Sequence, residues 1–75
     1  MSLEELFGSI LDVEPSSLTD ATAQAALKAW DSMAHVNLIA ALEETYGVQF
    51  STQEIQQMTS IGAARGLLRR KGADV

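Results

Sequence analysis

The stretch covering residues 30–47 constrains the fold most, because it has the pattern of a single bounded amphipathic helix. Asp31 is a favourable N-cap, since its carboxylate can accept hydrogen bonds from the unpaired amides of the first turn. Gly47 can adopt the left-handed conformation that ends a helix. Ser32 then falls on the first turn, at the positive end of the helix dipole, where an anion is favoured. This serine is therefore either part of a cap or an attachment point.

The rest of the chain predicts three further helices. Apolar residues at helical spacing predict the first over residues 3–11, and Ser2 with Glu5 fits a capping box at its start. A second capping-box pattern at residues 51–54 predicts a short helix that runs through residue 57. An apolar stripe predicts the last helix, which begins after residues 59–60 and ends near residue 71. The expected fold is all-α, with four helices and a short third one.

A long connection joins the first two predicted helices. Residues 15–30 combine turn-forming residues with a short run of high helix propensity, so we expect a long loop that contains a short helical turn. Trp30, the only tryptophan, is expected to close the end of the core beneath this loop, because large aromatic side chains usually bury area. In the following helix the expected core stripe is Leu38, Ile39, Leu42 and Tyr46.

Length, charge and residue content exclude several classes of function. Residues 1–75 are enough for a single domain with one core. With no cysteine and one histidine, the chain has no thiolate and cannot form a multi-histidine metal site. A net charge of −5 argues against nucleic acid and favours basic partners.

The chain start lacks the basic segment of a signal peptide, and no apolar run is long enough to span a bilayer. We therefore expect a cytoplasmic protein without membrane insertion.

A serine hydrolase would pair Ser32 with His35, three residues along the same helix. Such an enzyme also needs an orienting acid and an oxyanion hole, for which a domain this small has little room. We therefore expect no catalytic residues, and we expect His35 to face solvent on the helix surface. Adjacent Glu43 and Glu44 point in different directions around a helix, so they cannot act together on one substrate atom.

The motif Asp31-Ser32-Met33, continued by the apolar and acidic residues of 36–46, resembles the Asp-Ser-Leu segment of acyl carrier proteins. The resemblance extends over nearly the whole chain and implies a small four-helix bundle with a long first loop. It implies that a phosphopantetheinyl transferase attaches 4′-phosphopantetheine from coenzyme A to Ser32. A loading ligase would then add an acyl or aminoacyl group as a thioester, and downstream transferases would take it up. The carrier itself is expected to be a monomer. Matching positions place partner contacts at Asp31, Met33, Val36, Glu43 and Met58.

His35 and Asn37 stand where carriers of the fatty-acid type have acidic residues, which favours the free-standing carriers of specialised pathways. The alternative is an unmodified docking module that uses Met33, Val36 and Met58 as an apolar patch. A cleft between the second and third helices could bury an apolar acyl chain. Its expected lining is Leu42, Ile55 or Ile61.

Overall fold

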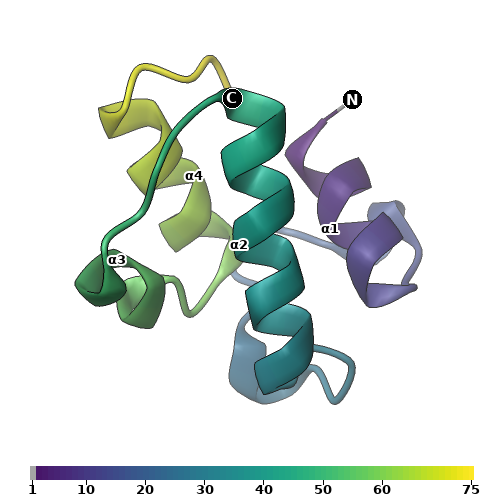
Figure 1. The fold of residues 1–75 in the computed structure, drawn as a ribbon. Helices are drawn as coiled ribbons and strands as arrows, with labels where there is room; N and C mark the ends of the chain where they lie inside the picture. The colour runs from purple at the N-terminus through teal and green to yellow at the C-terminus, as the bar shows by residue number, and fades with distance from the viewer. Residues whose placement is uncertain (1) are drawn as a thin grey trace.

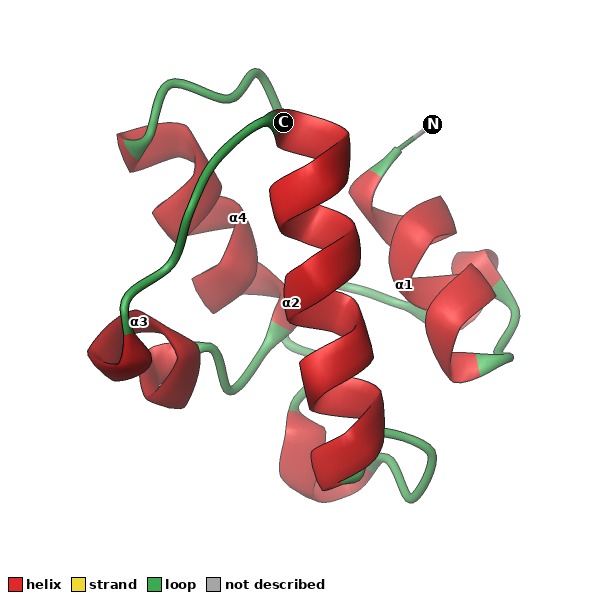
Figure 2. Ribbon diagram, in the orientation of Figure 1, coloured by secondary structure: helices red, strands yellow, loops and turns green. Residues whose placement is uncertain are grey.

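The structure is a computed structural model that describes residues 2–75. Among these residues it contains four α-helices and no strand. Figure 2 shows the helices in red, joined by green loops. The prediction of an all-α fold with a short third helix is confirmed. The helices are α1 (Leu3–Leu11), α2 (Ser32–Tyr46), α3 (Thr52–Gln57) and α4 (Ile61–Arg70).

Helix α2 is the longest and runs through the middle of the molecule. In Figure 1, α1 lies on one side of it and α3 and α4 lie on the other. Asp31 caps α2 by accepting a hydrogen bond from the Ala34 amide at 2.9 Å. Gly47 ends the helix in the left-handed conformation, with φ of 65°. Both boundaries therefore form as the sequence predicts.

Local capping also sets the starts of the shorter helices. Ser2 and Glu5 form a complete capping box on α1, and Ser51 and Glu54 form another on α3. The Ser60 hydroxyl accepts a hydrogen bond from the Ala63 amide at 3.0 Å and begins α4. Within the described residues, none of the helices is both long enough and apolar enough to cross a membrane.

The core is a single cluster to which every helix except α3 contributes fully buried or nearly buried side chains. Trp30, at the end of the long loop, is buried as expected, and its ring packs edge-on against Phe7 with the centroids 5.3 Å apart. The predicted stripe of α2 is buried at three of its positions, whereas Tyr46 is half-buried. These three positions are Leu38, Ile39 and Leu42.

Two short 3-10 turns, Pro15–Ser17 and Gln24–Ala26, interrupt the long loop where one turn was expected. Backbone hydrogen bonds attach this loop to the connection between α3 and α4. The Gln24 amide donates to Thr59 O at 2.9 Å, and the Ile61 amide donates to Thr22 O at 3.1 Å. The loop is thus part of the packed structure, and it ends directly before the start of α2.

Candidate functional site

Ser32 is the first residue of α2, and its side chain is exposed. The capping hydrogen bond to the Ala34 amide comes from Asp31, so the cap does not occupy the Ser32 hydroxyl. The first amides of a fifteen-residue helix and its dipole favour an anion at this end. The site therefore offers an accessible hydroxyl in a setting that suits a phosphate group.

Apolar side chains surround this serine on the outer face of α2. Met33 is 77% exposed and Val36 is 65% exposed, whereas most large apolar residues of the chain lie in the core. Ala40, one turn further along, is also exposed. These residues therefore form an accessible apolar surface next to Ser32.

A cavity of about 240 Å³ opens between α2 and α3, beyond this surface. Its position agrees with the expected cleft, and Ile55 lines it as predicted. The other two predicted lining residues, Leu42 and Ile61, are fully buried in the core instead. The inward side of α2 packs against the other helices, so only residues at the edge of that face can line the opening. The lining residues are Val36, Ile39, Ala40, Glu43 and Ile55.

Glu43 is half-buried, and its carboxylate accepts a hydrogen bond from the Phe50 amide at 2.9 Å. The sequence suggested a solvated acid that contacts partners, but this carboxylate stabilises the chain reversal after α2. Glu44 beside it is exposed. Any role for Glu43 in partner contact stays a prediction.

Met58 was predicted to contact partners, and the structure corrects this. The side chain is 0% exposed and belongs to the core. Met58 follows the last turn of α3, where the chain bends towards α4, and this bend turns the residue inward. In this conformation Met58 packs beneath the surface and is not available to a partner. The apolar surface beside Ser32 therefore consists of Met33 and Val36 without it.

His35 also differs from expectation, because it does not simply face solvent. The Trp30 indole Nε1–H donates to His35 Nδ1 at 2.9 Å, and His35 Nε2 lies 2.9 Å from the backbone oxygen of Ile55. The two aromatic rings are stacked with their centroids 6.0 Å apart. Both ring nitrogens are thus engaged away from Ser32. This arrangement argues against a serine hydrolase that uses His35 as its base.

Charged groups near the cavity are held in local structure. The Ser51 amide donates to the Glu54 carboxylate, which also pairs with Lys71 at 3.0 Å, and these contacts lower the pKa of Glu54 below its usual value. At the far end of α2, burial raises the pKa of Tyr46 above its usual value. Among residues 2–75, no group of three potential metal-ligating side chains lies close enough together to hold an ion.

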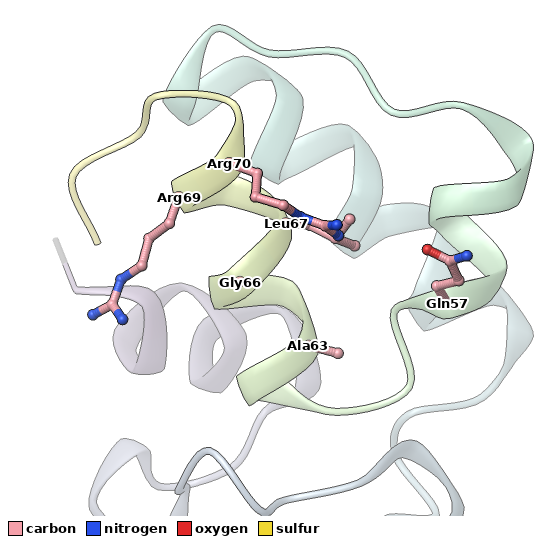
Figure 3. Close-up of a pocket in the computed structure, with 6 residues that line it drawn as sticks. All are labelled: Gln57, Ala63, Gly66, Leu67, Arg69 and Arg70. Carbon is pink, nitrogen blue, oxygen red and sulfur yellow. The ribbon is translucent and has the colours of Figure 1, made fainter.

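A second, open groove of about 600 Å³ lies between α3 and α4 (Figure 3). In this view Arg70 extends from α4 towards the α3 side, whereas Arg69 points away from Gln57. Arg69 Nε donates to the Val75 backbone oxygen at 2.7 Å. The groove contains no hydroxyl or carboxylate in its lining, and none of its lining residues belongs to α2. These residues are Gln57, Ala63, Gly66, Leu67, Arg69 and Arg70.

Comparison with known proteins adds to this geometry. A protein-family model described as a phosphopantetheine attachment site matches residues 2–68. The fold is similar to that of a holo acyl carrier protein from Geobacter metallireducens, with a TM-score of 0.82 and 33% identity. That match covers 92% of this chain and 79% of the other.

A holo acyl carrier protein from Nitrosomonas europaea is also similar, with a TM-score of 0.79 and 27% identity. The match covers 92% of this chain and 89% of that one. A search of curated proteins gave no match.

Proposed function

The chain belongs to the family of phosphopantetheine-bearing acyl carrier proteins, and we propose that Ser32 is the residue to which its 4′-phosphopantetheine is attached. The observation that carries this proposal is the placement of Ser32. Its side chain is exposed on the first turn of α2, and Asp31 makes the capping hydrogen bond in its place. The matched region includes this turn. The unmodified docking module has no comparable support.

The reaction requires little of this chain beyond presentation of one hydroxyl. Ser32 Oγ would attack the phosphorus of coenzyme A that bears the pantetheine, and adenosine 3′,5′-bisphosphate would leave as the P–O bond breaks. The serine proton would pass to a base of the transferase. Once attached, the group supplies a terminal thiol that can carry an acyl or aminoacyl cargo as a thioester. The amides and dipole at the start of α2 favour the new phosphodiester charge.

The proposed role is that of a carrier and not an enzyme, in a single domain formed by residues 1–75. Its partners would be a phosphopantetheinyl transferase, a loading ligase and downstream transferases in the cytoplasm. Asp31, Met33 and Val36 are the residues proposed to meet them, since all three are exposed around Ser32. The cavity beside Val36 has a mainly apolar lining, which favours an apolar acyl group over a charged one.

Intact mass after incubation with coenzyme A, Mg²⁺ and a broad-specificity phosphopantetheinyl transferase tests the attachment site. The wild type is expected to gain one phosphopantetheine, and Ser32→Ala is expected to gain none while retaining its helical circular dichroism. Ser9→Ala removes another exposed helical serine and should be modified like the wild type. Modification of Ser32→Ala, or no gain in folded wild type, would contradict the proposal.

A further inference from the structure

His35 lies three residues after Ser32 and connects three parts of the fold. Its Nδ1 accepts the hydrogen bond from the buried Trp30 indole at the end of the long loop. Its Nε2 reaches the Ile55 backbone oxygen in α3, and its own amide donates to Asp31 O in the first turn of α2. One imidazole ring therefore links the loop, the turn that carries Ser32 and the helix on the other side of the cavity.

These two contacts define the protonation state of the ring. An indole N–H can only donate, so Nδ1 must present a lone pair to Trp30. A backbone oxygen can only accept, so Nε2 must carry the hydrogen that points to Ile55. The arrangement needs the neutral ring with its proton on Nε2. A second proton, on Nδ1, would place the N–H groups of His35 and Trp30 opposite each other at a distance of 2.9 Å, where neither can accept.

We infer that His35 is a proton-sensitive positioning residue, whose neutral ring holds α3 and the Trp30 loop against the turn that bears Ser32. Trp30 has little freedom to turn away, because it is buried and packs on Phe7 of α1. Proton gain would thus leave the indole N–H without an acceptor or drive the His35 ring outward. In the second case the contact with Ile55 is lost as well, and α3 is released on one side of the cavity. The effect on modification rests on the proposed attachment at Ser32.

Charged groups occur on every element that meets this ring. Around helix α2, Asp31 lies about one turn before His35 and Glu43 about two turns after it. The loop contributes Lys28, and α3 contributes Glu54, which pairs with Lys71. On α1, whose Phe7 packs against Trp30, lie Glu4 and Glu5, and Asp12 follows the last residue of this helix. Within residues 2–75, none of these side chains forms an ion pair or hydrogen bond with the His35 ring.

Nitrogen NMR of the isotopically labelled, unmodified protein tests the linkage directly. Near neutral pH, the His35 ring is expected to carry its proton on Nε2. In spectra recorded from about pH 8 to about pH 5, the indole N–H resonance of Trp30 should shift together with the ring nitrogen signals of His35, because a proton on Nδ1 removes the acceptor of the indole. His35→Gln offers an acceptor and a donor but cannot titrate in this range, so its indole resonance should stay constant. A proton on Nδ1 near neutral pH, or an indole resonance that ignores His35, would overturn the inference.

The consequence for the site is tested by competition in one tube. Wild type and His35→Gln are mixed with coenzyme A, Mg²⁺ and the transferase, and the ratio of their modification rates cancels the pH dependence of the enzyme. Loss of a hydrogen bond predicts that the ratio of wild type to variant falls at least about twofold from about pH 8 to about pH 6. A constant ratio would overturn the effect on Ser32. Failure of both proteins to be modified would instead contradict attachment at Ser32, and the indole titration would then decide this inference.

Discussion

Asp31 has two separable properties, a hydrogen-bond acceptor and a negative charge. The acceptor caps α2 through the Ala34 amide at 2.9 Å. Asp31→Ala removes it and is expected to lower the free energy of unfolding by about 1 kcal/mol. Asp31→Asn keeps an acceptor of similar capping strength, so its stability should stay near that of the wild type. Urea unfolding followed by circular dichroism measures both. Equal losses in the two variants would show that the charge, and not the cap, stabilises this turn.

The positions of side chains whose contacts are local in sequence could be predicted. The positions of side chains whose partners lie far along the chain could not. Asp31 and Ser32 are defined by the helix start around them, and the structure places both there. His35 is different, since one of its partners is a backbone oxygen twenty residues away. Met58 is different as well, because the bend after α3 decides which way its side chain points. A single sequence carries no local signal for either arrangement.

Two glycines in α4 are expected to respond in opposite ways to the same change. A Cβ added at Gly66 meets nothing within 4 Å, so Gly66→Ala should raise the free energy of unfolding by about 0.5–1 kcal/mol through helix propensity. A Cβ at Gly62 would lie 2.9 Å from the Asp20 backbone oxygen. Gly62→Ala should therefore lower the free energy of unfolding by about 1–3 kcal/mol, because the long loop around Asp20 must move to make room for the methyl group. Urea unfolding measures the free energy of unfolding of both variants. A loss of stability in Gly66→Ala would mean that the open groove of α4 is more constrained than its geometry indicates.

The capping box of α3 should make stability depend on pH. The hydrogen bond from the Ser51 amide and the pairing with Lys71 lower the pKa of Glu54 in the folded state. A carboxylate with a depressed folded pKa contributes stability above its unfolded pKa and loses it as the pH falls through the folded value. Glu54→Gln keeps a capping side chain but cannot titrate. Its free energy of unfolding should therefore fall less steeply than that of the wild type between about pH 5 and about pH 3.

Urea unfolding at several pH values in this range measures the slope for Glu54→Gln. Glu44→Gln is the matched control, because Glu44 is exposed on α2 and outside any capping box. The control should follow the slope of the wild type. If the stability of Glu54→Gln changes with pH as steeply as that of the wild type, the capping box does not depend on the charge of Glu54.

The helices were predictable as elements because each begins with its own capping residues. The capping boxes at Ser2 and Ser51 are complete within four residues, so their hydrogen bonds form whatever packs above them. The long loop was less predictable, since it depends on contacts with the α3–α4 connection. Gln24 pairs with Thr59 and Ile61 with Thr22, and each partner lies more than thirty residues away. The number of turns in the loop follows from these distant bonds and not from local propensity.

Across the whole molecule, Arg65 joins three segments that lie far apart in the sequence, namely α4, α1 and the long loop. Its guanidinium on α4 forms ion pairs with Glu4 of α1 and, at 3.0 Å, with Asp20 of the long loop. The side chain is only 16% exposed, so solvent screens these pairs less than it would on an open surface. Arg65 thus complements the backbone bonds that hold the loop, and with them the approach to α2.

Arg65→Met keeps much of the apolar stem and removes the charge. We expect it to lower the free energy of unfolding by about 1–2 kcal/mol, because charge-assisted hydrogen bonds to two carboxylates are lost. Arg70→Met is the control on the same helix, since Arg70 is exposed, and its effect should stay within about 0.5 kcal/mol. Thermal or urea unfolding gives both values. The coupling energy between Arg65 and Glu4 comes from comparing Arg65→Met, Glu4→Gln and the variant that carries both changes. If the effects of the two single variants simply add, the ion pair between Arg65 and Glu4 contributes nothing to stability, which would contradict this prediction for α1.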